Sequence, residues 1–102
     1  MQSAKIAAVR IDPDGRLCVV PEGVSFPLVY RAAMEVQWSD EGGFLYSPRP
    51  REWSYQQWFQ QILSAVKDEY GYNLLPTSLT RWSDIAPHLK DAMIKATASN
   101  ET

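Results

Sequence analysis

The chain has 102 residues, a length at which one domain can bury a core without a metal or a disulfide. Its 10 basic and 12 acidic residues leave a net charge of −2, so no long-range attraction draws it to nucleic acid or to an anionic membrane. The single cysteine, Cys18, excludes an intrachain disulfide and a cysteine-based metal site. We therefore expect a cytoplasmic protein with no metal, no cofactor and neither nucleic acid nor membrane as a partner.

The first predicted element is a β-hairpin. Residues 5–11 and 16–20 are rich in apolar and β-branched side chains, as strands are. The segment Asp12-Pro13-Asp14-Gly15 lies between them and is the strongest turn signal in the chain. Turn chemistry alone explains why two carboxylates lie so close together here.

A second hairpin is predicted further along. Every second residue from Leu28 to Trp38 is apolar, which predicts one long strand over 27–38 with one buried face. Two glycines in the loop that follows precede a short apolar segment, 44–47, which should pair with this strand. The prolines just after it end the sheet, because proline removes ladder donors.

From residue 55 onward the apolar spacing becomes three and four, which is typical of one helix face. This spacing predicts a helix over 54–70, with Ser54 as its N-cap and Gly71 as its stop. A second helix is predicted over 83–97, since Pro87 fits only within a first turn. Between the helices, 72–75 could be an edge strand or a packed loop, and the tail 97–102 should fray.

The predicted fold class is α+β, because strand runs precede helix runs. We expect one domain over 1–102. It should hold an antiparallel four-stranded meander (about 5–11, 16–20, 27–38 and 44–47) followed by two helices. The first helix should pack on one sheet face, formed by the alternating side chains Leu28, Tyr30, Met34 and Trp38.

No motif for catalysis or phosphate binding stands out. His88 is the only histidine, and it should lie on the surface or near a helix start. An enzyme that uses His88 as a base with Asp84 or Asp91 remains an alternative, since those spacings allow contact on a helix.

An aromatic cluster with two arginines is the main candidate for function. Six of the twelve aromatic residues lie between positions 44 and 59, around Arg49 and Arg51. These side chains could simply form the core, or they could form a binding surface, where Trp, Tyr and Arg are enriched. The hypothetical binding residues are Arg49, Arg51, Trp53, Tyr55 and Trp58. We expect a non-enzymatic interaction domain that self-associates or binds a protein. The alternative is a small-molecule binder with an aromatic pocket and an arginine anchor.

The outward face of the first helix predicts self-association. It carries four neutral amides where charged residues are more usual: Gln56, Gln57, Gln60 and Gln61. Such a face could meet its own copy without repulsion between like charges. We therefore expect a homodimer, with a plain polar surface as the alternative.

Three segments carry a resemblance to known proteins. They are Ile11–Leu17, Phe26–Trp38 and Leu45–Trp53. Together they resemble small bacterial proteins carried on the mobile gene cassettes of integrons, and the resemblance covers residues 5–70. It implies a bacterial, cytoplasmic source and assigns neither an activity nor any site residue.

Overall fold

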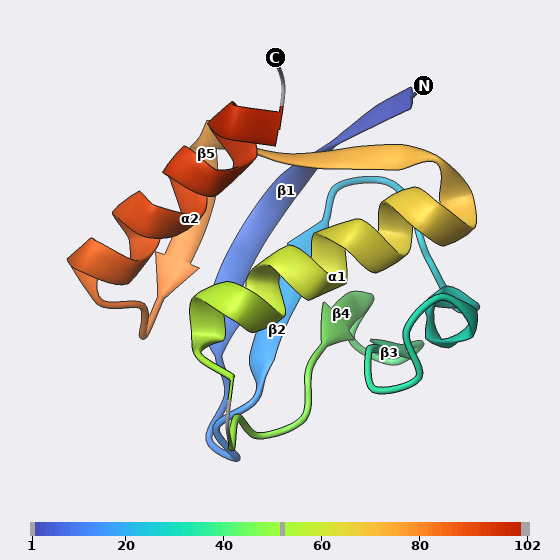
Figure 1. The fold of residues 1–102 in the computed structure, drawn as a ribbon, viewed down its shortest axis with the longest axis horizontal. Helices are drawn as coiled ribbons and strands as arrows, with labels where there is room; N and C mark the ends of the chain where they lie inside the picture. The colour runs from blue at the N-terminus through green and yellow to red at the C-terminus, as the bar shows by residue number, and fades with distance from the viewer. Residues whose placement is uncertain (1, 52, 101–102) are drawn as a thin grey trace.

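The computed structural model describes residues 2–51 and 53–100, without the side chains of residues 98–100. It is a mixed α+β fold with one five-stranded sheet and two α-helices, as Figure 1 shows. The elements in chain order are β1 (Gln2–Ile11), β2 (Leu17–Pro21), the 3₁₀ helix η1 (Val29–Arg31), β3 (Gln37–Ser39), β4 (Phe44–Tyr46), α1 (Tyr55–Tyr70), β5 (Tyr72–Ser83) and α2 (Pro87–Asn100).

The first predicted hairpin is confirmed. Strands β1 and β2 pair antiparallel, with Arg10 opposite Cys18. Gly15 closes the turn at a φ of +84°, a conformation that favours glycine, and its N–H donates to the carbonyl of Asp12 over 2.9 Å. The turn therefore forms where proline, aspartate and glycine predict it.

The predicted four-stranded antiparallel meander is correct in part: β1, β2, β3 and β4 pair antiparallel, but their order is not that of a meander, and a fifth strand joins the sheet. The strand order is β3-β4-β2-β1-β5, so β4 rather than β3 lies beside β2. A long connection that contains η1 joins β2 to β3. Strands β3 and β4 form a small hairpin, and β4, the second strand of this hairpin, pairs with β2. At the other edge, β5 pairs parallel to β1.

Strand β5 resolves the ambiguity over residues 72–75. These residues pair with residues 2–5 of β1, so they form part of the sheet rather than a packed loop. Pro76 does not end the strand; the pairing shifts after it, from Ile6–Pro76 to Ala8–Arg81. Because β5 is an edge strand, it tolerates the missing proline N–H and this irregularity.

The predicted long strand over 27–38 is also wrong, since only Gln37–Ser39 forms a strand in this region. The backbone instead makes bonds three residues apart, such as Ala32 N–H to Val29 O (3.1 Å) and Val36 N–H to Ala33 O (3.0 Å). A second, helical periodicity decides the packing. The residues directed to the core are spaced by three, four and three: Phe26, Val29, Ala33 and Val36.

The side chains predicted to meet the first helix mostly face outward. Leu28, Tyr30 and Met34 are 42%, 46% and 84% exposed, and only Trp38 of that set packs against the core. Helix α1 packs instead against β5, α2, η1 and β2, and its buried side chains share one core cluster with Leu17, Val19, Val29 and Leu74.

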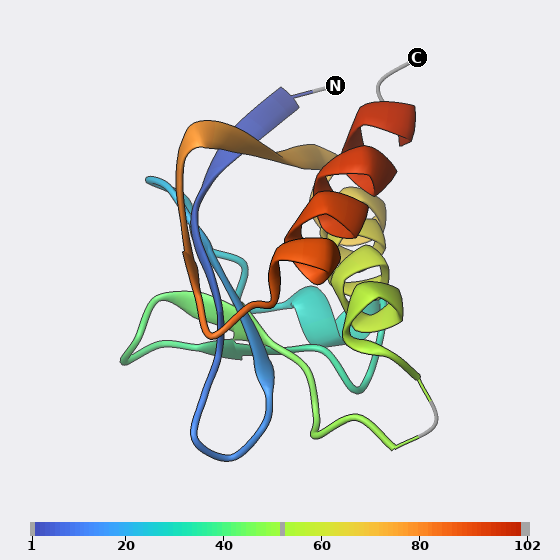
Figure 2. The same ribbon diagram turned by 90° about the vertical axis from the view of Figure 1, so that its left-hand side faces the viewer.

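Both helices lie on the same side of the sheet, as Figure 2 shows.

Ser54 caps α1 as predicted, since its Oγ accepts the N–H of Gln57 and the Gln57 side chain accepts the N–H of Ser54. Gly71 ends α1 in the left-handed conformation, also as predicted. In the described part of the chain, neither helix is long and apolar enough to cross a membrane.

Helix α2 begins later than the predicted residue 83. Ser83 still pairs with Arg10 in the sheet, and Pro87 is the first helical residue, where proline lacks no hydrogen bond that the helix needs. The helix extends to Asn100, and residues 101–102 lie outside the described part of the chain, so fraying of the tail stays a prediction.

Candidate functional site

An open hollow of about 890 Å³ lies beside the first turn of α1, and we call it the Arg/Trp hollow. Its wall combines three arginines with three aromatic rings. The lining residues are Arg16, Glu35, Gln37, Tyr46, Pro48, Arg49, Arg51, Trp53 and Trp58. They come from the turn before β2, the segment that leads from η1 into β3, strand β4, the loop after β4, and α1. The hollow therefore forms where the edge of the sheet meets the helix start.

Arg16 is held firmly by the turn before β2. The Asp12 carboxylate accepts the Arg16 N–H over 2.8 Å and the Arg16 Nε–H over 3.0 Å, and the guanidinium lies 4.9 Å from the centre of the Tyr46 ring. Burial raises the pKa of the Asp12 carboxyl, but these hydrogen bonds outweigh burial and hold the pKa below its usual value. The side-chain hydrogen bond to Asp12 raises the pKa of Arg16. The charge of Arg16 is thus compensated inside the protein.

Arg49 and Arg51 differ from Arg16 because neither is paired with a carboxylate of the described residues. Arg49 donates from Nε to the carbonyl of Asp14 over 2.8 Å, which positions the side chain but leaves its charge unpaired. Neither Arg49 nor Arg51 forms an ion pair among residues 2–51 and 53–100. The hollow therefore presents two guanidinium groups that are available to an anion.

Two tryptophans form the apolar part of the wall. The Trp53 and Trp58 rings lie 4.8 Å apart between centroids, at an angle of 47°. Trp53 is 43% exposed, whereas Trp58 is 7% exposed and belongs to the core cluster. The buried Nε1–H of Trp58 has no acceptor within the described residues. A buried donor of this kind costs about 1–3 kcal/mol when it is left unsatisfied.

The structure brings together four of the five predicted binding residues, since Arg49, Arg51, Trp53 and Trp58 all line the Arg/Trp hollow. Tyr55 does not line it. Its hydroxyl donates to the carbonyl of Gly15 over 2.9 Å and so ties the β1–β2 turn to α1. Tyr55 is therefore a positioning residue for the wall that carries Arg16.

Sequence reasoning missed the remaining lining residues: Arg16, Glu35, Gln37, Tyr46 and Pro48. Tyr46 and Pro48 adjoin the aromatic cluster in sequence, so extending the cluster would have found them. Glu35 and Gln37 lie in the segment predicted to be a long strand, and no local signal connects that segment to the cluster.

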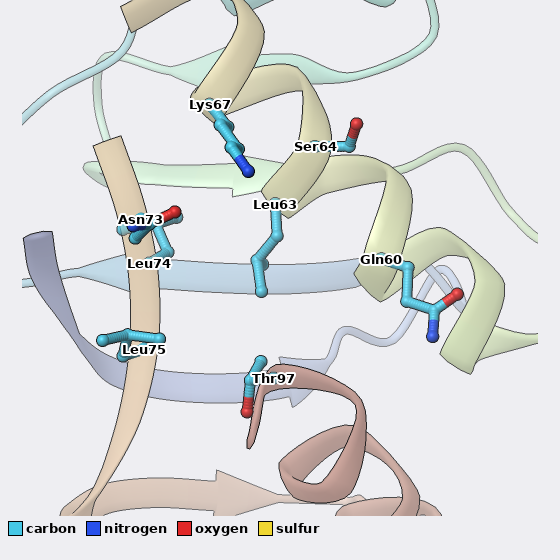
Figure 3. Close-up of a pocket in the computed structure, with 8 residues that line it drawn as sticks. All are labelled: Gln60, Leu63, Ser64, Lys67, Asn73, Leu74, Leu75 and Thr97. Carbon is cyan, nitrogen blue, oxygen red and sulfur yellow. The ribbon is translucent and has the colours of Figure 1, made fainter. Parts of the chain in front are cut away.

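The predicted glutamine face is divided among different roles. Gln57 belongs to the capping box, and Gln60 lines a smaller hollow of about 220 Å³. Figure 3 shows this second hollow, where Leu63 of α1 extends toward Thr97 of α2 beside β5. Gln56 and Gln61 are half-buried. Contact of this face with a second copy stays a prediction.

His88 is exposed at the start of α2 and lines neither hollow. In the part of the chain that the structure describes, it contacts neither Asp84 nor Asp91 through a hydrogen bond or an ion pair. Over the same residues, no group of three or more His, Cys, Asp or Glu side chains is placed to hold a metal ion.

Comparison with known proteins gives the class first: the sequence is that of an integron cassette protein. The chain belongs to the family described as Integron Cassette Protein Hfx_Cass5, whose model matches residues 4–79. The resemblance found in the sequence is therefore confirmed.

A solved structure is also similar to this chain. It is described as "Structure from the mobile metagenome of North West Arm Sewage Outfall: Integron Cassette Protein Hfx_Cass5". The two chains are 42% identical over 96% of this chain and 98% of that one, with a TM-score of 0.48. A comparison with curated proteins finds no match.

Proposed function

We propose that this protein is a non-enzymatic binding protein for a small acidic molecule with an apolar body, taken up in the Arg/Trp hollow. The observation that carries the proposal is the convergence of Arg49 and Arg51, which form no ion pair among the described residues, with Trp53 and Trp58 around one hollow of about 890 Å³. Ligand sites are typically concave, about 300–1,000 Å³ in volume, and apolar with a few placed polar groups.

The charges of the hollow favour an acid over a neutral ligand. Arg16 is already paired with Asp12, so it contributes to the shape and rigidity of the wall more than to the attraction of an anion. Arg49 and Arg51 remain free to bind a carboxylate, for which guanidinium geometry is well suited. Trp53, with 43% of its surface exposed, offers a ring face on which an apolar body can pack.

The proposal is tested by titrating the protein with 2-naphthoate in isothermal titration calorimetry. We expect Arg51→Gln to weaken binding about tenfold, because a charge-assisted hydrogen bond is lost. Trp53→Ala should weaken binding to a similar degree without unfolding the protein. Arg81→Gln is the matched control, because Arg81 is an exposed arginine of β5 that does not line the hollow. Equal loss in Arg51→Gln and Arg81→Gln, or no binding to the unaltered protein, would contradict the proposal.

A protein-binding role is the second candidate, favoured by apolar side chains at the surface. Leu28, Tyr30 and Met34 are exposed near one another in sequence, and large exposed apolar side chains mark interaction sites when they form a patch.

We place the protein in the reducing cytoplasm, where Cys18 stays a thiol. Self-association through the glutamine face of α1 stays a prediction, and native mass spectrometry over a dilution series would detect a dimer.

A further inference from the structure

The second hollow, of about 220 Å³, lies between α1, β5 and α2 and has no part in the proposed function. Four side chains of α1 border it, and they recur at intervals of three and four residues: Gln60, Leu63, Ser64 and Lys67. This spacing places them along one side of the helix. Residues 73–75 of β5 and Thr97 of α2 complete the lining, so three elements that are consecutive in the chain meet around one space.

The polar groups of this second hollow are suited to an anion. Among the described residues that line it, Lys67 alone is charged, and it forms no ion pair in that part of the chain. Figure 3 shows the Lys67 side chain extending along α1 toward Leu63, one turn earlier, which carries Nζ away from the carbonyl end of the helix and toward the hollow. Asn73 lies across from it on β5, half-buried, and its side-chain amide has no hydrogen-bond partner among residues 2–51 and 53–100.

The remaining lining is mostly apolar and determines what the rest of a ligand can be. Leu74 is 2% exposed, and Leu63 and Leu75 are half-buried. Thr97 Oγ1 already donates to the carbonyl of Ile94 over 2.8 Å, so its proton is not available to a ligand. This hollow is much smaller than the Arg/Trp hollow of about 890 Å³ and lies below the usual size of a site for a drug-sized molecule. A short aliphatic chain fits such a space and covers the three leucines.

We propose that the second hollow binds a short aliphatic carboxylate. The carboxylate lies between Lys67 Nζ and the side-chain amide of Asn73, both of which can donate hydrogen bonds to it. The hydrocarbon chain packs on Leu63, Leu74 and Leu75. This inference does not rest on the proposed function, because it concerns a separate site with other residues and a smaller ligand.

The probe is 4-methylpentanoate, titrated into protein with ¹³C-labelled leucine methyl groups and followed by NMR. We expect the methyl signals of Leu63 and Leu75 to move, and Leu63→Met and Leu75→Met identify these signals by their loss. A ligand this small should bind with a Kd on the order of 1 mM. The matched compound 4-methylpentanamide has the same shape without the charge, and acetate has the charge without the chain. Both should bind at least about tenfold more weakly, because each lacks one of the two interactions. Equal binding of the amide and the acid, or no movement of these leucine signals, would overturn the inference.

Matched variants locate the binding. Lys67→Gln should weaken binding of 4-methylpentanoate about tenfold, and Lys67→Arg should retain most of it, because a charged donor remains. Lys90→Gln is the control, since Lys90 is a lysine of α2 that lines neither hollow. An equal loss in Lys67→Gln and Lys90→Gln would overturn the inference. Loss in Arg51→Gln but not in Lys67→Gln would place the acid in the Arg/Trp hollow and would also overturn it. Failure of 2-naphthoate to bind in calorimetry would instead contradict only the proposed function.

Discussion

At its middle, α1 supplies Phe59, Ile62 and Val66 to the core, whereas at its first turn the same helix supplies Trp58 to the wall of an open hollow. These three side chains are fully buried. Near the first turn, the buried Nε1–H of Trp58 has no acceptor, and Arg49 and Arg51 form no ion pair, among the residues that the structure describes. The difference indicates that the middle of the helix contributes mainly to stability, whereas its start borders the hollow in which we propose that a ligand binds.

The largest expected effect lies in the middle of α1. Phe59→Ala removes a fully buried ring and leaves a cavity, so we expect the free energy of unfolding to fall by about 3–5 kcal/mol in urea denaturation. Leu79→Ala is the control, because Leu79 is 84% exposed and its truncation should change stability by less than about 0.5 kcal/mol. Similar effects of the two changes would contradict the assignment of Phe59 to the core.

A smaller effect is expected where the helix start holds the turn. Tyr55→Phe removes the hydroxyl that donates to the carbonyl of Gly15, and we expect a loss of about 1 kcal/mol in the free energy of unfolding. The same variant should also weaken binding of 2-naphthoate slightly, since the turn carries Arg16. Tyr30→Phe, at an exposed tyrosine, is the matched control and should change neither quantity.

The smallest expected effect depends on pH. The folded pKa of Asp12 lies below its ordinary value of 3.8, so the charged carboxylate stabilises the fold above that pH, and this contribution is lost as pH falls through the folded pKa. Asp12→Asn should therefore lower the free energy of unfolding by about 1 kcal/mol or less at neutral pH, because Arg16 is partly exposed to solvent.

The difference between Asp12→Asn and the unaltered protein should become smaller in acid, which urea denaturation at about pH 7 and pH 2.5 would show. Asp14→Asn is the control, since that side chain is 75% exposed and lies 3.4 Å from Arg16. A difference for Asp12→Asn that stays constant between the two pH values would show that its carboxylate contributes nothing through its charge.

Elements with strong local signals could be predicted from the sequence. The Asp12–Gly15 turn and the caps of α1 depend on neighbours within four residues, and both form where predicted. The segment 27–38 could not be predicted in the same way, because it contains two apolar patterns. One alternates along the chain, and the other has the three- and four-residue spacing of a helix. The side chains with the helical spacing are the ones that pack in the core. The parallel pairing of β5 with β1 depends on residues far apart in the chain, and no local pattern indicates it.

The candidate site follows the same division. Arg49, Arg51, Trp53 and Trp58 are close in sequence, so an aromatic and arginine cluster could be recognised before the fold was known. Arg16 and Glu35 reach the same hollow only through the sheet order, which the sequence did not indicate. The missing acceptor of Trp58 is a property of packing and has no counterpart in the sequence.

The pairing of β1 with β5 also has a consequence for synthesis on the ribosome. Gln2 pairs with Tyr72 and Arg10 with Ser83, so β1 gains its outer neighbour only when most of the chain has been made. Until then β1 presents an unpaired edge, the kind of surface through which nascent chains aggregate. Such non-local pairing also slows folding. We expect the β1–β2 hairpin to be stable only after β5 has been synthesised and has paired with β1. A chain truncated before residue 72 should therefore aggregate rather than fold.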